Sequence, residues 1–422
     1  MRCTPIESVT APAAVPHPAR KPRMVIAANA ILGAGGQGLN LQHMAEGLCE
    51  SFELSIFCRA STDIAPTQVV PGSRSEAIIG ATPLLRRARD LQAHLSATHF
   101  DRYVATRLPA AELFQGVTGQ CAFSLLAARA RGMRTVTDVV TAHVDEFCTQ
   151  AARECAAFGV RPPLSDATRR RMLAEYASAD LVRVMSERAR LTFLDRGFPE
   201  DRIVAVAPHI NLDEFPAADF AGPKFRISFV GLIEPWKGFH HLVAAFNSLR
   251  LADSELVLWG GPGSRPVSSF LRDAMARNPA IIIRPVEVRR IGYSEVYGKS
   301  SVLVHPSLTD GFGYTVLEGM ASGLPVIVAD GAGAADLVVD GCNGYVVPAG
   351  QSGPIAERLE HLYHDPGLMR RMGEAARRTA GELTLARFRE RYIPRLLALC
   401  DGGSPRAGMA GIPNSGTRSD GG

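Results

Sequence analysis

The feature that most constrains the fold is a repeated alternation of short apolar runs with helical patterns. The runs are continuous in Val, Ile and Leu, which indicates strands covered by helices on both faces, as in a parallel sheet. After a link at 217–224 that contains Pro and Gly, the alternation starts again, which predicts two α/β units. The candidate strands are 24–29, 53–58, 103–106, 134–141, 180–185 and 203–207 in the first unit, and 226–230, 255–259, 281–285, 301–305 and 325–329 in the second.

The length of 422 residues is enough for two or three domains with full cores. Ligands of doubly wound sheets bind outside the carboxyl ends of the strands, so two such units predict a cleft between domains. We expect a disordered tail at 1–22, a first domain at 23–217, a second at 224–385, a helix at 386–400 that crosses back to the first domain, and a disordered tail at 401–422.

Composition excludes several classes of protein. The net charge is only +4 with both signs interspersed, so nothing predicts a nucleic-acid partner. The apolar runs are too short for a membrane span. The eight cysteines form no CxxC pair and no zinc spacing, which favours reduced thiols and a cytoplasmic location. The arginine run at 169–171 leaves peripheral contact with the inner face of a membrane open.

The segment DGFGYTVLEGMASGLPV, at 310–326, carries the clearest chemistry. Gly311 and Gly313 let the backbone approach a ligand, and the helix expected at 314–321 offers its first N–H groups to an anion. Asp310 and Glu318 flank that helix start and suit hydrogen bonds from hydroxyl groups on either side of it. A nucleotide-diphosphate sugar has this arrangement of sugar, diphosphate and ribose. Taken singly, the two residues also fit a helix cap and an exposed helix side chain.

This segment resembles the EGFGxxxLEAMAxGxPV signature of the retaining glycosyltransferases of family 4, which have the GT-B fold of two Rossmann-like domains. The resemblance implies transfer of a sugar, as by a hexosyltransferase, from a nucleotide-diphosphate sugar to a hydroxyl acceptor: a glycan, a lipid-linked saccharide or a small molecule. Asp310 stands where the family has Glu, and Gly319 stands where it has Ala.

The resemblance also implies roles for individual residues. Asp310 would orient the transferred sugar and Glu318 would bind the ribose. Lys237, in the segment EPWKG, would neutralise the diphosphate, although Leu232 occupies the position where the family has an arginine. The other donor-binding residues expected from it are Gly35, Gly36, Glu287, Phe312, Gly313, Tyr314 and Thr315.

In the first half, the strand at 134–141 leads to His143, which matches a histidine that contacts the reacting sugar in the family. His143 is therefore expected beside the reacting carbon, while the sequence does not choose among Asp138, Asp145 and Glu146 for the acceptor side. The chain has no Asp-x-Asp for a metal-clamped diphosphate, so we expect no metal and no cofactor. The leaving group would be met by Lys237 and backbone amides.

Two alternatives remain at this stage. The glycines at 33, 35 and 38 match GxGxxG, which is typical of dinucleotide oxidoreductases, but Cys58 and Arg59 follow where an acidic residue would bind the ribose of NAD. The departures at Leu232 and Asp310 also allow a protein that binds sugar nucleotides without transferring them.

Overall fold

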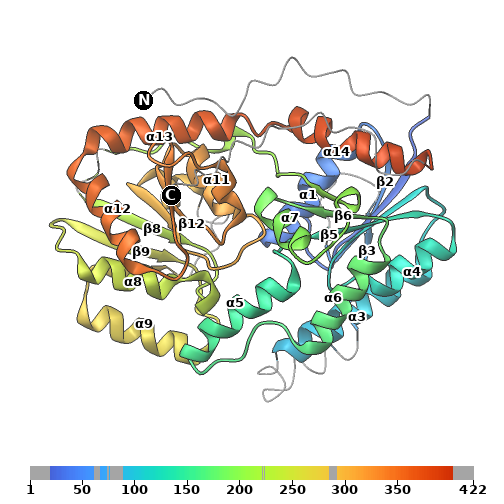
Figure 1. Ribbon diagram of the computed structural model, residues 1–422, viewed down its shortest axis with the longest axis horizontal. Coiled ribbons are helices and arrows are strands. Elements are labelled where there is room, and N and C mark those ends of the chain that lie inside the picture. The colour runs from blue at the N-terminus through green and yellow to red at the C-terminus, as the bar shows by residue number, and fades with distance from the viewer. Residues whose placement is uncertain are drawn as a thin grey trace, which may run out of the picture.

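The computed structural model describes residues 20–60, 67–73, 76, 89–220, 222, 224–284 and 292–402. Two parallel sheets, each covered by helices, lie side by side (Figure 1). Nearly all of the expected tails, 1–22 and 401–422, lie outside the described residues.

The first sheet has seven parallel strands in the order β3-β2-β1-β4-β5-β6-β7. Its strands are β1 (Arg23–Ala27), β2 (Glu53–Cys58), β3 (Thr67–Val69), β4 (Leu113–Val117), β5 (Arg134–Val139), β6 (Leu181–Val184) and β7 (Ile203–Ala205). Its helices are α1 (Gly35–Leu48), α3 (Arg89–Arg107), α4 (Ala122–Ala130), α5 (Val144–Ala157), α6 (Asp166–Ser178) and α7 (Glu187–Leu194), with short turns η2 (Glu200–Arg202) and η3 (Leu212–Glu214).

The second sheet has six parallel strands in the order β10-β9-β8-β11-β12-β13. Its strands are β8 (Phe225–Val230), β9 (Ser254–Trp259), β10 (Ile281–Arg284), β11 (Val302–His305), β12 (Val326–Ala329) and β13 (Gly344–Val347). The helices are α8 (Phe239–Ser248), α9 (Arg265–Arg277), α11 (Tyr314–Ala321), α12 (Ser352–His364), α13 (Pro366–Gly381) and α14 (Leu385–Cys400), with short turns η4 (Pro235–Lys237), η5 (Ser294–Gly298) and η6 (Gly333–Leu337).

Numbered within its own sheet, each domain begins with the strand order 3-2-1-4-5-6, which is the Rossmann order. The order reverses between β1 and β4 in one sheet and between β8 and β11 in the other. Ligands bind at such switch points, so the loops after β1, β8 and β11 are the places to examine for a site. The predicted fold class, two doubly wound Rossmann-like domains in the GT-B arrangement, is confirmed.

One expected strand is wrong, and three strands, β3, β4 and β13, were not expected. Residues 103–106 belong to α3, where Phe100 and Val104 form a buried helical face with a spacing of four. The strand in this region is β4, whose central Gln115 and Gly116 weaken its apolar pattern. The edge strand β13 also escaped prediction, because the run GYVV at 344–347 is short and starts with glycine.

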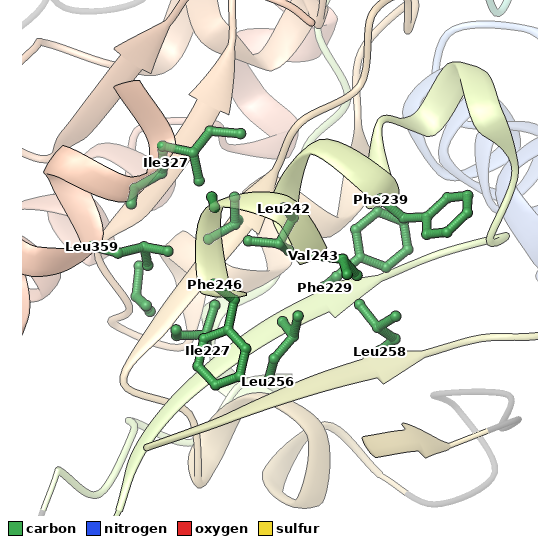
Figure 2. Close-up of a cluster of buried hydrophobic side chains, with 14 of the residues drawn as sticks. Ile227, Phe229, Phe239, Leu242, Val243, Phe246, Leu256, Leu258, Ile327 and Leu359 are labelled. Atoms are coloured by element: carbon green, nitrogen blue, oxygen red, sulfur yellow. The ribbon is translucent and has the colours of Figure 1, made fainter. Parts of the chain in front are cut away.

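The second domain has a hydrophobic core of its own. Aliphatic and aromatic side chains from β8, β9 and α8 interlock, and Ile327 and Leu359 close the cluster from β12 and α12 (Figure 2). Fully burying each such side chain contributes about 1.5–3 kcal/mol. The cluster holds β8 and β11 firmly, and those strands carry the loops at the cleft.

The last helix joins the two domains. Figure 1 shows α13 along the second domain and α14 continuing beside α1 of the first domain. Phe388 and Tyr392 of α14 are buried in the core of the first domain, and the Tyr392 hydroxyl donates to Gln115 Oε1 at 2.8 Å. A Cβ on Gly47 of α1 would lie 2.1 Å from the Phe388 ring, so the close packing of these helices requires glycine there.

No helix in the described part of the chain is long and apolar enough to cross a membrane. Among the described cysteines, Cys49, Cys58, Cys121, Cys148, Cys155 and Cys400 are free thiols. The expectation of reduced cysteines is wrong for Cys342, which is disulfide-bonded.

Candidate active site

The loop after β11 and the start of α11 lie at the cleft. A Cβ on Gly311 would lie 2.4 Å from the Val140 carbonyl oxygen, which follows β5 in the first domain. Gly313 has φ of 100° and caps α11 without a side-chain oxygen. Only glycine fits both positions well. The start of α11 therefore offers amides and the positive end of the helix dipole to an anion.

Asp310 and Lys237 form an ion pair beside this helix start. Lys237 Nζ lies 2.5 Å from Asp310 Oδ2, and His305 Nε2 lies 3.2 Å from the same oxygen. Burial alone would raise the pKa of Asp310, but the Lys237 charge and the hydrogen bond with His305 lower it well below its usual range. The structure thus brings together an ionised carboxylate and a cation that the sequence places 73 residues apart.

Glu318 lies on the second turn of α11, beside a tyrosine. Tyr297 donates a 2.6 Å hydrogen bond from its hydroxyl to Glu318 Oε2. Burial and the negative charge of Glu318 raise the pKa of Tyr297 well above its usual value, so the hydroxyl keeps its proton and remains the donor. Tyr297 therefore fixes the orientation of the carboxylate, and sequence reasoning did not identify this residue.

Three neighbours of the loop differ in what they can offer a ligand. The Phe312 ring is buried in the core, so only its backbone could contact a donor. Thr315 Oγ1 lies 3.3 Å from His305 Nδ1, which links the first turn of α11 to the Asp310 group. Tyr314 reaches the other domain, where its hydroxyl donates to Asn40 Oδ1 at 3.3 Å.

The predicted glycine loop lies at the start of α1. Gly35 has φ of 62°, and both Gly35 and Gly36 are exposed. The first turn of α1 has no acidic residue and no side-chain cap. A Cβ on Gly38 would lie 1.9 Å from the Ile31 carbonyl oxygen, so this glycine serves the turn itself. Asn40, just beyond the loop, brings α1 against Tyr314 of α11.

A buried polar network supports the first-domain side of the cleft. Arg183 donates from Nη1 to Asp138 Oδ1 and to Asn40 Oδ1, both at 2.8 Å, and Asn40 Nδ2 donates to Asp138 Oδ2 at 2.6 Å. Arg183 and Asp138 are almost fully buried. Asp138 therefore neutralises Arg183 and orients Asn40, and its carboxylate is used for structure.

His143 caps α5. Its Nδ1 accepts a 3.2 Å hydrogen bond from the Asp145 backbone N–H, and its ring packs against Phe193 and Tyr176 with centroids 4.7 and 5.5 Å apart. Burial lowers its pKa to about 4, despite the opposing charge of Asp145, so the ring is neutral at pH 7. The ring contacts found here all belong to the first domain, and its contact with a sugar stays a prediction.

The remaining acidic candidates also have partners. Asp145 pairs with Arg169 at 2.5 Å, and Glu146 pairs with Arg196 at 2.8 Å. Glu287, expected near the nucleobase, lies outside the described residues.

Direct contacts close the two domains on each other. Ser186 Oγ donates to the Gly311 carbonyl oxygen at 2.7 Å, and Arg188 Nε lies 3.1 Å from Asp336 Oδ1. A small pocket lies between α1, α11 and the link near η3. Its polar lining includes His43 and Glu46 from one domain and Glu318 from the other.

Leu232 marks the main difference from the family signature. It lies in the loop between β8 and η4 and is 51% exposed. An exposed leucine cannot neutralise a diphosphate, so Lys237 is the cation that this loop offers.

Two facing Rossmann-like domains with a glycine-capped helix and an Asp–Lys pair at the cleft define a GT-B protein. Residues 212–379 match the family model for glycosyl transferases group 1. The match covers the second domain and leaves residues 1–211 outside it.

Curated proteins named as glycosyltransferases are similar to parts of the chain. The chain is 31% identical over 201 residues to the D-inositol 3-phosphate glycosyltransferase of Streptomyces bingchenggensis, covering 43% of this chain and 44% of that protein. It is 40% identical over 93 residues to the putative glycosyltransferase EpsD of Bacillus subtilis, covering 22% and 24%. The matched segments thus span less than half of these curated relatives.

Solved structures match over most of the chain. Anabaena HepE in complex with UDP-glucose has a TM-score of 0.66 at 15% identity, covering 89% of this chain and 100% of that one. Sucrose-phosphate synthase from Thermosynechococcus elongatus has a TM-score of 0.68 at 18% identity, covering 89% and 99%. At these identities the likeness establishes the fold.

Proposed function

We propose that this protein is a retaining, metal-independent glycosyltransferase of family 4 that transfers a sugar from a nucleotide-diphosphate sugar to a hydroxyl acceptor. The observation that carries the proposal is the Lys237–Asp310 pair beside the glycine-capped start of α11, with Glu318 on the next turn. The family match and the relatives named as glycosyltransferases favour this activity over a nicotinamide-dependent oxidoreductase.

In this proposal the diphosphate lies between the starts of α1 and α11. Lys237 Nζ, the amides near Gly35 and Gly36, and the α11 helix dipole offset its charge. Lys237 has three N–H donors, so it can bind a phosphate oxygen while it keeps its contact with Asp310. Asp310 then accepts hydrogen bonds from hydroxyls of the transferred sugar, and Glu318 accepts from the ribose.

The chemical step forms a bond between the acceptor oxygen and the anomeric carbon, on the face from which the phosphate oxygen departs. The carbon–phosphate-oxygen bond breaks, and the acceptor proton passes to the departing phosphate oxygen. The configuration at the anomeric carbon is therefore kept, with no covalent enzyme intermediate. The closed domain contacts exclude water, which would otherwise hydrolyse the donor.

A donor screen tests the proposal. Thermal shifts are measured with UDP, GDP, ADP and CMP sugars in EDTA, beginning with UDP-glucose because the HepE complex contains it. A bound donor raises the melting temperature by mass action. Proton NMR of the transfer product then gives its anomeric configuration. A response to nicotinamide cofactors and to no sugar nucleotide contradicts the proposal; binding without transfer to any acceptor supports the silent binding protein instead.

A further inference from the structure

A second polar cluster lies where α5 of the first domain meets α8 of the second. Phe158, just after α5, packs on Phe239 and Phe270 with ring centroids 5.7 and 5.4 Å apart. Phe147 of α5 faces Trp236 of η4 at 6.4 Å. Figure 1 shows α5 reaching from the first domain toward α8 and α9. This aromatic contact buries a polar group that needs its own explanation.

That group is Glu154, which points at two consecutive histidines. Its Oε2 lies 2.8 Å from His240 Nε2 and 3.1 Å from His241 Nε2, and the three ligand atoms lie within 4.8 Å of one another. Consecutive helical side chains diverge by about 100°. The two rings nevertheless turn toward each other, with centroids 4.0 Å apart, so both nitrogens converge on one oxygen.

Among the described residues, one permanently charged cation lies near Glu154. Glu154 is 7% exposed. In the described part of the chain, its cationic neighbour is Arg153, whose side chain is 81% exposed and lies 4.0 Å from the other carboxylate oxygen. A buried carboxylate is unfavourable unless a cation or hydrogen-bond donors offset its charge.

We propose that Glu154, His240 and His241 form a divalent transition-metal site of the zinc class that links the two domains. Imidazole nitrogens and a carboxylate oxygen are ligands that Zn²⁺ prefers, and water reaching the partly exposed His241 would complete a tetrahedral set. His240 Nδ1 has no hydrogen-bond partner among the described residues. A missing outer partner lowers metal affinity, so moderate affinity is expected.

The site differs from the proposed transfer chemistry, which needs no metal at the diphosphate. Its ligands come from α5 and α8, so separating the domains would remove Glu154 from the histidines. A bound ion therefore favours the arrangement in which α5 stays packed on the second domain.

Cobalt binding to the tag-free full chain tests the site, because Co²⁺ bound by nitrogen and oxygen ligands absorbs visible light. We expect one equivalent of Co²⁺ to give a visible band that Zn²⁺ removes, and Zn²⁺ to raise the melting temperature. His241→Asn and Glu154→Gln lose both effects, whereas His364→Asn, an exposed histidine on α12, keeps them. Circular dichroism confirms that each variant is folded.

The link between domains has its own readout. Zn²⁺ should slow amide hydrogen exchange in both α5 and α8. No visible band, an unchanged band in His241→Asn, or slower exchange in α8 alone would overturn the proposal and leave a hydrogen-bonded Glu–His cluster.

Discussion

The two sides of the cleft use their charged residues differently. On the second domain, Lys237 and Asp310 form an ion pair beside the start of α11, and Glu318 lines the pocket between the domains. On the first domain, Asp138 is buried against Arg183, and the His143 ring packs inside its own domain.

This difference suggests that the charged residues of the second domain bind a ligand and those of the first domain stabilise the fold. The second domain carries its charged groups on loops that end in glycine-capped helix starts, where a ligand can reach them. The first domain uses its charged pair to hold α1, β5 and β6 together beneath the cleft. Substitutions on the first side should therefore change stability most, and those on the second side should change donor binding and turnover.

The largest expected effect is on stability, from Asp138→Asn. Removing one partner of a buried ion pair leaves Arg183 uncompensated, which lowers the free energy of unfolding by about 3–5 kcal/mol. Urea denaturation at pH 7 measures it. Glu382→Gln, which breaks a half-exposed pair with Arg387, is the control and should cost at most about 1 kcal/mol. An equal loss of unfolding free energy in the two variants would contradict the structural role of Asp138.

Lys237→Met should have the largest effect on catalysis. Removing a charge aimed at the departing phosphate lowers kcat/KM by about 10²–10³-fold. Lys299→Met, at an exposed lysine paired with Glu295, should leave kcat/KM unchanged. If Lys237→Met keeps more than about a tenth of the wild-type kcat/KM, the loss is smaller than removal of such a donor should cause. Other groups would then offset the charge of the diphosphate.

Substitutions of Glu318 and Asp310 should affect donor binding and turnover differently. Losing hydrogen bonds to a charged group costs about 1.5–3 kcal/mol. Glu318→Ala should therefore weaken donor binding strongly, whereas Asp310→Ala should mainly lower kcat. Calorimetric titration with the donor nucleotide and steady-state rates give the split, with Glu357→Ala on the exposed face of α12 as control. Unchanged binding and rate in both variants would contradict these roles.

The smallest effect concerns pH and His143. Its pKa of about 4 in the folded protein lies below the ordinary 6.5, so the unfolded chain binds the proton more readily. The lowered pKa of His143 therefore contributes fully to the free energy of unfolding above pH 6.5. This contribution is lost as the pH falls toward 4, by up to about 2 kcal/mol between pH 6.5 and 5.

The comparison that isolates this effect is His143→Asn, since asparagine is also a good helix cap. Unfolding free energies of both proteins at pH 7 and pH 5 should show a smaller loss in the variant. Identical losses would mean that the His143 ring titrates normally.

Much of the second domain was predictable because its signals are local. The strand–loop–helix pattern around Gly313 fixes where α11 begins, and the helix expected at 314–321 matches α11. The loop carrying Lys237 follows β8 directly. The contact between Tyr297 and Glu318 could not be predicted from the sequence. The two residues are 21 positions apart, and only the packing of the fold brings them together.

The first domain was less predictable because its contacts are distant in sequence. Asn40 is 98 residues from Asp138 and 143 from Arg183. Nothing in the pattern around Asp138 distinguishes a buried ion pair from an acceptor-binding carboxylate. The strand expected at 103–106 was wrong for a related reason. Burial of Phe100 and Val104 on one face of α3 overrides the strand preference of Tyr and Val.

Calorimetric titration of the full-length chain with UDP, GDP, ADP and CDP in EDTA addresses the central claim most directly. The account predicts that one of these diphosphates binds at a single site without divalent metal, and that Lys237→Met loses this binding while Lys299→Met retains it. Binding of none of them, binding only after metal is restored, or equal affinity in Lys237→Met would contradict it.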